Sequence, residues 1–392
     1  MSARRRLLVG LALAAASLGA AELGVRLFVL PNEKLVWRPL PPFTGQQTEE
    51  QLAWLARQSG DDANASAYGR FDPVLGWSQR PSSASPDGAV HIDARGRRSA
   101  HAYAEPTPEG TRRVVVCGDS FTFGEEVSDA DTWAARLEVV LPRCEVWNYG
   151  VGGYGTDQAL MRVQREVEGP VEVLLVGLLL ENIGRNVNRY RPLWYPSALP
   201  AVKPRYVPSA VGLELVPQPF ATRAEFLAAV RDGTVLERCA EHEFWSDPFV
   251  PAPLAWSAIA RLFAARSAYR ARDIEILWAD PAGEPFRTTL ALLEAFRGAA
   301  QGLGARRWGV LVFPSREDVA ARLELGAPYW QELLTALGQR EIEHLDLSDA
   351  LTEAARAEGG VTALYRASHY SPHGNEIVAE AVRAWLAPQL DD

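Results

Sequence analysis

A serine that follows a glycine and an aspartate is the residue of this chain with the clearest chemical potential. Residues Val114–Cys117 form an apolar run that predicts a fully buried parallel strand. Gly118 then favours a tight turn, and Ser120 stands two residues further on. Open α/β sheets bind ligands beyond the carboxyl ends of their strands, so this turn would present the Ser120 hydroxyl to a substrate. The same pattern is also typical of a turn in which Asp119 and Ser120 only cap the backbone.

Other stretches hold the residue types that acyl transfer through a serine needs. Such a reaction requires a base that takes the hydroxyl proton and N–H donors that stabilise the developing oxyanion. Residues 148–155 are rich in glycine, Glu181 and Asn182 follow a second apolar run, and His369 precedes the last predicted helix.

These stretches resemble the conserved blocks of a known family. Residues 118–124, Gly-Asp-Ser-Phe-Thr-Phe-Gly, resemble block I of the SGNH (GDSL-type) serine hydrolases. Residues 148–155 look like block II, residues 181–183 stand where block III normally reads Asn-Asp, and residues 369–374 look like block V. The resemblance spans roughly residues 111–388, with less support across 195–300. It implies the SGNH-hydrolase fold, a flavodoxin-like three-layer α/β/α sandwich around a five-stranded parallel sheet.

The resemblance also implies roles for single residues. Ser120 would be the nucleophile and His369 the base. The oxyanion donors would be the backbone N–H groups of Ser120 and Gly153 and the side-chain amide of Asn182. A gapless comparison instead places Glu181 at the asparagine position, and a shift of one residue restores Asn182 to it. No cofactor and no metal are implied.

The third member of a triad is where the chain departs from the family. The family carries an aspartate three or, in some branches, two residues before the histidine, and here those positions hold Arg366 and Ala367. An arginine cannot accept the imidazole N–H. A backbone carbonyl, Ser368, Glu181 or an acid from elsewhere remain open as substitutes, and a Ser-His dyad is a further alternative.

A second histidine lies close to the first. His373 is the rival base, four residues after His369, where the family pattern does not need a histidine. The two could also suggest a metal pair, but Pro372 between them argues against one helical face.

The N-terminal segment predicts a membrane anchor. Arg4-Arg5-Arg6 precedes an apolar run over residues 7–21, and a second apolar stretch covers 23–30. A basic start with a short apolar core is typical of a secretory signal or a signal-anchor. Fifteen helical residues span about 22 Å, less than the roughly 30 Å hydrocarbon core, whereas a helix that extends to residue 30 would span it.

We therefore expect residues 1–30 to be an uncleaved signal-anchor with the enzyme on the extracytoplasmic side. Glu22 and Arg26 would then snorkel towards the outer interface. Cleavage after Ala21 and secretion is one alternative, and a buried amphipathic helix of a cytosolic protein is another.

Composition agrees with an enzyme of this size and excludes one class of partner. The chain has 392 residues, of which 47% are hydrophobic, and its 40 basic and 49 acidic residues give a net charge of −9. The basic residues are scattered, so a nucleic-acid partner is not indicated. Cys117 continues the predicted strand, while Cys144 and Cys239 could pair in an oxidising compartment if their distance allows.

The pattern of the chain predicts three regions. After the anchor comes a proline-rich and irregular lead-in over residues 31–110. A catalytic domain over 111–390 follows, with an insertion at about 185–285 that holds no strand of the main sheet. Expected strands are 113–117, 145–148, 171–177, 308–313 and 342–347, and expected helices are 131–141, 157–168, 290–302, 329–338, 348–358 and 375–388.

The function expected from these residues is a membrane-tethered extracytoplasmic serine esterase. It would hydrolyse carboxylic esters, acetyl esters in the first place, through an acyl-Ser120 intermediate. Its partners would be the membrane and an ester or acylated-carbohydrate substrate. The alternatives are an O-acetyltransferase acting on a cell-surface polysaccharide and a catalytically degenerate glycan-binding member.

Overall fold

The centre of the molecule is a parallel sheet. The computed structural model describes residues 3–29, 49, 52–53, 68–99, 101–104, 106–194, 201–210, 212–246, 254 and 256–390. The sheet strands are β5 (Arg112–Cys117), β6 (Cys144–Asn148), β7 (Val173–Leu179), β10 (Arg307–Phe313) and β11 (His344–Asp346). Their order, β11-β10-β7-β5-β6, is the flavodoxin-like order, and all four pairings are parallel. The predicted fold class is confirmed.

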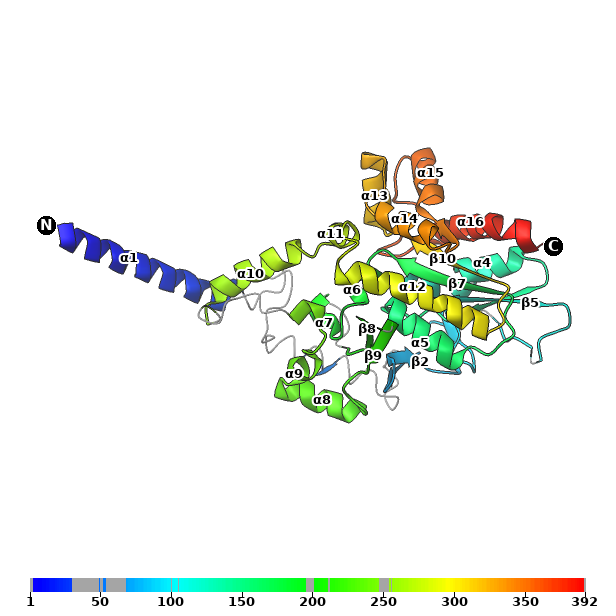
Figure 1. Ribbon diagram of the computed structural model, residues 1–392, viewed down its shortest axis with the longest axis horizontal. Helices are drawn as coiled ribbons and strands as arrows, with labels where there is room; N and C mark the ends of the chain where they lie inside the picture. Colours follow the sequence, from blue (N-terminus) through cyan, green and yellow to red (C-terminus); the bar gives the residue numbers. More distant parts are fainter. Residues whose placement is uncertain are drawn as a thin grey trace.

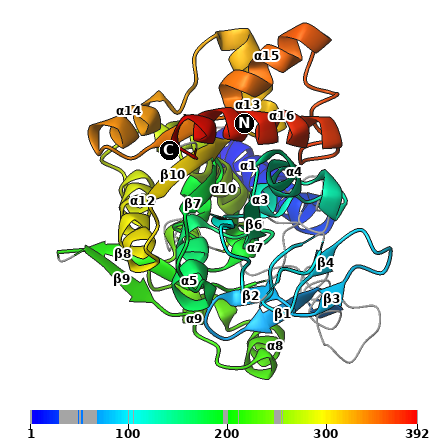
Figure 2. The ribbon, with the colours of Figure 1, turned by 90° about the vertical axis from the view of Figure 1, so that its right-hand side faces the viewer.

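Helices cover both faces of this sheet. Alternate residues of β5 point to opposite faces, so Val114 and Val116 pack in one core and Val115 and Cys117 in the other. Helices α4 (Trp133–Val140), α15 (Ser348–Glu358) and α16 (Pro372–Leu390) supply the first core, and α5 (Thr156–Glu166) and α12 (Glu284–Gly302) supply the second. Figure 2 shows the resulting three layers.

The expected helices of the sandwich are present with shifted ends. Helix α12 begins at Glu284, six residues before the predicted start at 290, because Pro285 stands in its first turn, where the missing N–H costs nothing. Helix α14 (Gln331–Gln339) is at its expected place, and α13 (Arg316–Leu325) was not predicted. Ser315 caps α13 by accepting from the Asp318 N–H.

The lead-in is built of turns and short strands where the structure describes it. Two antiparallel pairs form there: β1 (Gly69–Asp72) with β2 (Gly76–Gln79), and β3 (Ser83–Ala84) with β4 (His91–Ile92). The Arg98 N–H donates to the Asn148 carbonyl at 3.0 Å, which attaches this segment beside the end of β6. The proline-rich stretch 31–42 lies outside the described residues.

The region expected as an insertion contains helices and one hairpin. Strands β8 and β9 pair only with each other, so the described part of this region adds no strand to the main sheet. Its elements are α6 (Asn182–Arg185), α7 (Arg191–Trp194), β8 (Arg205–Ser209), β9 (Gly212–Val216), α8 (Arg223–Asp232), α9 (Val235–Cys239), η3 (Phe244–Ser246), α10 (Ala258–Arg270) and α11 (Ile274–Trp278).

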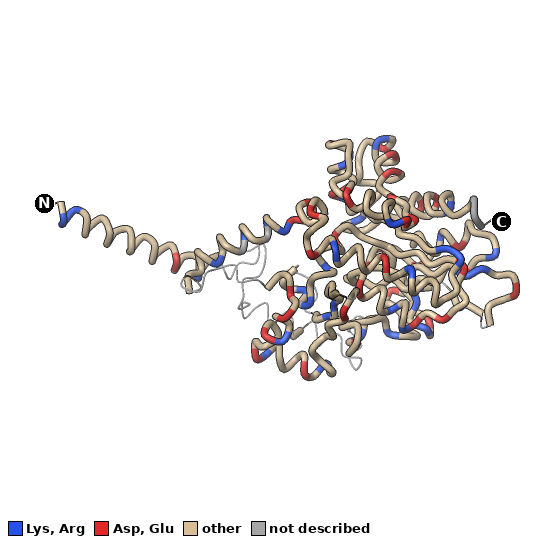
Figure 3. The backbone as a smooth tube through the Cα atoms, in the orientation of Figure 1, with Lys and Arg blue, Asp and Glu red and all other residues tan. Residues whose placement is uncertain are grey.

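The N-terminal helix projects away from the rest of the molecule (Figure 1). It consists of α1 (Ala3–Gly24) and a wider turn, η1 (Val25–Val29), and none of its residues is buried. These 27 residues are long and apolar enough to cross a membrane. Figure 3 shows no charge along the helix between its basic start and Glu22.

The three cysteines are free thiols. Cys117, Cys144 and Cys239 are all buried, and no disulfide joins them. The pairing of Cys144 with Cys239 that the sequence left open is therefore not formed.

Candidate active site

The Ser120 turn begins where β5 ends. Gly118 has φ +155°, and a Cβ there would lie 2.8 Å from the Gly177 carbonyl oxygen on the neighbouring strand, so only glycine fits. Asp119 caps the short helix α3 (Ser120–Phe123) by accepting from the Phe121 N–H at 2.9 Å. Ser120 is thereby fixed at the carboxyl edge of the sheet with 5% of its surface exposed.

The glycine-rich loop after β6 is bonded to this turn. The Val151 N–H donates to the Gly118 carbonyl at 3.1 Å, and the Asn148 side chain accepts from the Gly150 N–H at 2.9 Å. Gly153 has φ +78°, a left-handed conformation that favours glycine. The strands β5 and β6 therefore bring Gly153 to the same edge as Ser120.

An arginine joins the loops after β5, β6 and β7. Arg185 is 6% exposed, and its Nη1 lies 3.5 Å from Asp119 Oδ2 and 3.3 Å from the Tyr154 carbonyl oxygen. Its Nη2 lies 3.1 Å from Glu181 Oε1, which also accepts from the Trp194 indole N–H at 3.1 Å. Burial raises the pKa of Asp119, and the Arg185 charge opposes that shift.

Glu181 and Asn182 are adjacent but differ in their contacts. Burial opposes ionisation of Glu181, yet Arg185 and Arg191 hold its pKa below the usual range, so the carboxylate is charged. Asn182 is 1% exposed, and its amide interacts with the Asp119 carboxylate, a contact that opposes the effect of burial on the pKa of Asp119. This contact places the amide beside the Ser120 turn, which makes Asn182 a candidate donor to a ligand bound there.

The loop before α16 presents His369 to the Ser120 turn. The imidazole packs on Phe121, the residue after Ser120, with ring centroids 4.9 Å apart. The Arg366 N–H donates to the His369 carbonyl at 2.9 Å, which closes the loop, and 15% of the His369 side chain is exposed. The rival His373 lies on α16, contacts Glu358 at 2.6 Å, and has 48% of its side chain exposed.

The carboxylate at His369 belongs to Glu126. Its Oε1 lies 2.9 Å from His369 Nδ1 and accepts from the Ser368 hydroxyl at 2.7 Å. Its Oε2 accepts from the Ala367 N–H at 2.9 Å and from the Ser368 N–H at 3.2 Å. Because a carboxylate only accepts hydrogen bonds, Nδ1 carries a proton in this contact.

The backbone of Glu126 is strained to reach this position. Its φ is +69°, in the left-handed region, which costs a residue with a side chain about 1–2 kcal/mol. Burial alone would raise the pKa of Glu126, but the hydrogen bonds from His369 and Ser368 outweigh it and lower the pKa to about 2. Glu126 therefore stays ionised beside His369 at neutral pH.

A second glutamate stands on the other side of the imidazole. Glu125 Oε2 lies 3.7 Å from His369 Nε2, and Oε1 lies so close to Gly152 that a Cβ there would be 2.0 Å away. Although 37% of this side chain is exposed, its carboxylate lies among protein atoms. Burial raises the pKa of Glu125, and the charges of His369 and Arg185 only partly offset this rise. With Nδ1 protonated, this contact is favourable when the imidazole is charged or Glu125 is protonated.

The structure thus brings the predicted residues to one edge of the sheet. Ser120, Gly153, Asn182 and His369 all follow the carboxyl ends of strands or precede α16 at that edge. No hydrogen bond joins the Ser120 hydroxyl to His369 among the described residues, and Nε2 faces Glu125 instead. Among the substitutes left open for the missing acid, Glu181 has its carboxylate on Arg185 and Trp194, and Glu126 is the acid from elsewhere in the chain that contacts His369.

Sequence reasoning did not single out Glu125 or Glu126. The only available signal was their place directly after the Ser120 turn, two acids following Gly124. Nothing in the sequence indicates the left-handed backbone of Glu126, because glycine or asparagine is the residue expected there.

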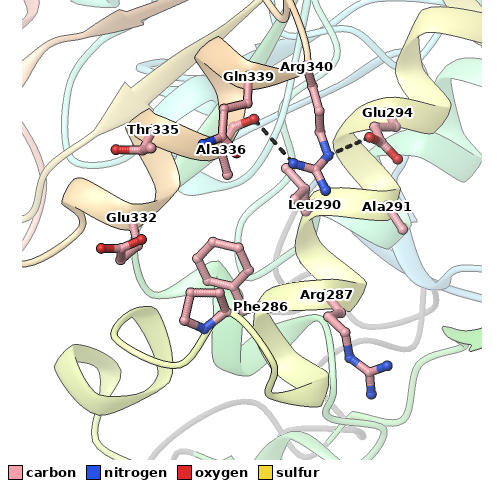
Figure 4. A pocket seen from close by; sticks show the side chains of 11 residues that line it. Phe286, Arg287, Leu290, Ala291, Glu294, Glu332, Thr335, Ala336, Gln339 and Arg340 are labelled. Atoms are coloured by element: carbon pink, nitrogen blue, oxygen red, sulfur yellow. Dashed lines mark hydrogen bonds and ion pairs between the residues drawn. The ribbon is translucent and has the colours of Figure 1, made fainter.

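A separate pocket of about 320 Å³ lies between α12 and α14. Figure 4 shows Phe286 and Leu290 of α12 facing Ala336 and Gln339 of α14, with an ion pair of 2.7 Å between Arg340 and Glu294. None of its lining residues belongs to the four motif stretches, so this pocket is not part of the candidate site.

Comparisons with known proteins found similar solved structures only. No protein-family model and no curated protein matches the chain. A lipolytic G-D-S-L family protein from Veillonella parvula is 11% identical with a TM-score of 0.34, covering 70% of this chain and 97% of its own. A G-D-S-L family protein from Desulfitobacterium hafniense is 13% identical with a TM-score of 0.35, covering 70% and 99%. An acetylxylan esterase from Geobacillus stearothermophilus, solved as a catalytic mutant, is 13% identical with a TM-score of 0.32, covering 70% and 93%.

Two of these proteins are described as members of the family that residues 118–124 resemble. At such identities and TM-scores the likeness decides neither activity nor substrate.

Proposed function

We propose that this chain is a serine esterase that hydrolyses short carboxylic esters, acetyl esters in the first place, from the extracytoplasmic face of a membrane. The observation that carries the proposal is the His369 imidazole, which packs beside the Ser120 turn while its Nδ1 donates to the ionised Glu126. Serine, histidine and carboxylate are the three groups of a hydrolytic triad, and a triad is recognised by geometry rather than by sequence position.

The first step is acylation of the serine. His369 Nε2 takes the hydroxyl proton as Ser120 Oγ attacks the ester carbonyl carbon, and Glu126 stabilises the imidazolium that forms. The tetrahedral intermediate then collapses, the proton passes from Nε2 to the leaving alcohol, and the acyl group stays on Ser120. Water repeats these steps in the second half, with the serine as the leaving group.

The oxyanion needs N–H donors. The Asn182 amide can donate and lies beside Asp119 of the Ser120 turn, whereas the Glu181 carboxylate can only accept and is held by Arg185 and Trp194. This difference supports Asn182 as the side-chain donor, with the Ser120 and Gly153 N–H groups as the backbone donors.

The resting site requires one movement before catalysis. The Glu125 carboxylate lies beside Nε2 and against Gly152, where an ester would approach. Its side chain has to turn outward, towards its exposed side, for the substrate to enter. A small acyl group such as acetyl needs the least displacement, which supports the choice of short esters.

The chain lacks the acid that the family carries before His369, and this absence was the argument for a non-catalytic protein. Glu126 meets that need from another loop, and its strained backbone is the kind of local cost that persists where the surroundings enforce it. The membrane tether is supported by the apolar helix Ala3–Val29 and by the basic residues at its start, which favour that end inside.

The test is covalent labelling of the serine. The full chain in detergent should react with a fluorophosphonate at Ser120, and Ser120→Ala should lose both the label and the hydrolysis of p-nitrophenyl acetate. Ser267→Ala, at an exposed serine of α10, is the matched control and should keep both. Thermal unfolding should be equal in the two variants. A label mapped to another serine, or hydrolysis that persists in Ser120→Ala, would exclude the proposal.

The same preparation decides between hydrolysis and transfer. Adding oligosaccharide acceptors and measuring acetylated products against free acetate separates an esterase from an O-acetyltransferase, because both pass through the same acyl-serine. Acetate as the main product at high acceptor concentration supports the esterase.

A further inference from the structure

The end of the N-terminal helix is bonded to a distant segment of the chain. Glu22 accepts hydrogen bonds from the Ala258 N–H at 2.6 Å, the Ile259 N–H at 3.1 Å and the Ser257 hydroxyl at 3.0 Å. These groups form the N-terminus of α10, whose unpaired N–H groups and helix dipole favour a negative charge. Arg26 donates to Glu22 at 2.8 Å and also to the Trp256 carbonyl.

This bonding fixes the depth of α10 relative to the helix Ala3–Val29. If Leu7 lies at the inner edge of the hydrocarbon core, a rise of 1.5 Å per residue places Glu22 about 22 Å further along. The hydrocarbon core is roughly 30 Å thick, so Glu22 lies about 8 Å inside its outer edge. The N-terminus of α10 has to lie at the same depth, because it is hydrogen-bonded to Glu22.

Apolar side chains surround this junction and are open to the outside. The exposed fractions are 57% for Leu27, 73% for Phe28, 50% for Leu254 and 68% for Trp256. They continue the exposed apolar surface of α1, on which no residue is buried. Tryptophan prefers the interface between lipid and water, where its ring is in contact with acyl chains and its N–H with polar groups.

We propose that Leu254 and residues 256–259, which lead into α10, are seated in the outer part of the lipid bilayer together with the end of the N-terminal helix. The occupant of this surface is lipid, because the surface is continuous with the helix that crosses the bilayer. The inference rests on the membrane tether of the proposed function. Two segments then hold the chain at the bilayer, the N-terminal helix and the residues that lead into α10, and we call this arrangement the clamp. It holds the catalytic domain at a fixed height and orientation relative to the membrane. Glu22 is then the group that joins the two segments, and not a residue that snorkels alone.

The experiment measures contact with lipid at single positions. The full chain is reconstituted into phosphatidylcholine–phosphatidylglycerol vesicles with an environment-sensitive fluorophore on Trp256→Cys, and spin-labelled lipid is used as the quencher. Val139→Cys on α4 is the matched control, an equally apolar site that is 86% exposed but lies on the catalytic domain. The native cysteines are buried, and the unmutated chain gives their background labelling.

Quenching at least about 3-fold stronger at position 256 than at position 139 is expected. Equal quenching at the two positions would overturn the proposal, as would quenching at 256 by a soluble quencher alone. The latter result would mean that Trp256 faces water or a protein partner.

The joint itself is tested with Glu22→Leu. Leucine keeps the N-terminal helix apolar but cannot accept the three hydrogen bonds, so quenching at position 256 should fall at least 2-fold. Glu22→Gln keeps an acceptor oxygen and should retain most of the quenching. Unchanged quenching in Glu22→Leu would overturn the role of Glu22. Extraction of the vesicles at alkaline pH separates this inference from the membrane tether. Release of the full chain from the vesicles would refute the tether and the clamp together. Retention of the chain with no quenching at position 256 would refute the clamp alone.

Discussion

The contact between Glu126 and His369 makes the sharpest prediction about catalysis. Glu126→Gln preserves the size of the side chain but removes its charge and replaces one acceptor oxygen by an amide. Both oxygens of Glu126 now receive donors: the His369 Nδ1–H and the Ser368 hydroxyl on Oε1, and the Ala367 and Ser368 N–H groups on Oε2. A glutamine amide must therefore face at least one donor.

The expected loss follows from which donor that is. If the glutamine oxygen stays at Nδ1, the imidazolium loses only its charged partner, which is worth about 1.5–3 kcal/mol, or roughly 10- to 150-fold in rate. If the amide turns to Nδ1, the imidazole adopts the other tautomer, Nε2 carries the proton, and the loss approaches 10⁴-fold, on the order seen when a triad acid becomes an amide. We expect kcat to fall by about 10- to 10⁴-fold with little change in KM.

The assay is p-nitrophenyl acetate hydrolysis, with Glu358→Gln as the matched control. Glu358 pairs with His373 at 2.6 Å, so the control removes the charge of an equally close glutamate–histidine pair away from Ser120. It should leave kcat unchanged. Arg366→Ala should also stay within a few-fold of the wild type, because the Arg366 N–H that donates to His369 remains in alanine.

Two results would refute the reasoning. Activity of Glu126→Gln within about 3-fold of the wild type would show that the carboxylate does not assist the imidazole. A total loss in Arg366→Ala with normal thermal stability would show that the position before His369 still serves catalysis. A fall in activity of Glu126→Gln that only follows a lower Tm would indicate that the loop has been disrupted, and Glu126→Asp then serves as the test, since a retained charge should restore part of the rate.

Three further predictions concern neighbouring groups. Asn182→Ala should lower kcat by roughly 10²–10³-fold, the usual cost of one oxyanion donor, whereas Glu181→Gln should keep kcat within about 10-fold. The reverse order would assign the role to Glu181. Glu125→Gln should raise Tm more at pH 8 than at pH 4. Burial raises the pKa of Glu125, so the wild type loses stability as the pH rises above the ordinary pKa of a glutamate, whereas the variant with an amide does not. An equal effect on Tm at both pH values would contradict this. Lys203→Met should reduce the free energy of unfolding by about 3–5 kcal/mol in denaturant titrations, because it leaves the fully buried Asp157 carboxylate without the Lys203 ammonium. A loss below about 1 kcal/mol would mean that Asp157 is protonated in the folded state.

The centre of the sheet could be predicted from the sequence because its strands are apolar runs bounded by turn residues. Val114–Val116 is buried on both faces of the sheet and therefore reads as a continuous apolar stretch, and similar runs define β7 and β10, whereas the outer strands β6 and β11 contain polar residues. Helix ends were less predictable. The start of α12 depends on Pro285, which ends most helical patterns but is tolerated in a first turn, and α13 depends on the cap at Ser315.

The contacts of the N-terminal helix show a different limit. Its apolar length is visible in the sequence, and Glu22 reads there as a charge that must snorkel. Its partners Ser257 and Ala258 lie more than 230 positions away, and no local pattern links the two segments. Only the folded arrangement shows that the charge is satisfied by a helix N-terminus.

The same limit applies to the candidate site, where some residues can be placed from the sequence and the acid cannot. Ser120, Gly153 and Asn182 each follow the end of a strand, so the order of strands is enough to place them at one edge. The acid differs, because an imidazole N–H accepts any carboxylate that reaches it, whichever loop provides it. In this chain the position three residues before His369 holds an arginine, and the loop after Ser120 takes a left-handed turn at Glu126 that carries a carboxylate to Nδ1. The Glu126 carboxylate also accepts from the Ala367 and Ser368 N–H groups of the histidine loop, so one side chain both orients the imidazole and holds its loop against the Ser120 turn. An acid supplied from the histidine loop itself could not fasten the two loops together, and this second role is a physical reason for the acid to reside at position 126.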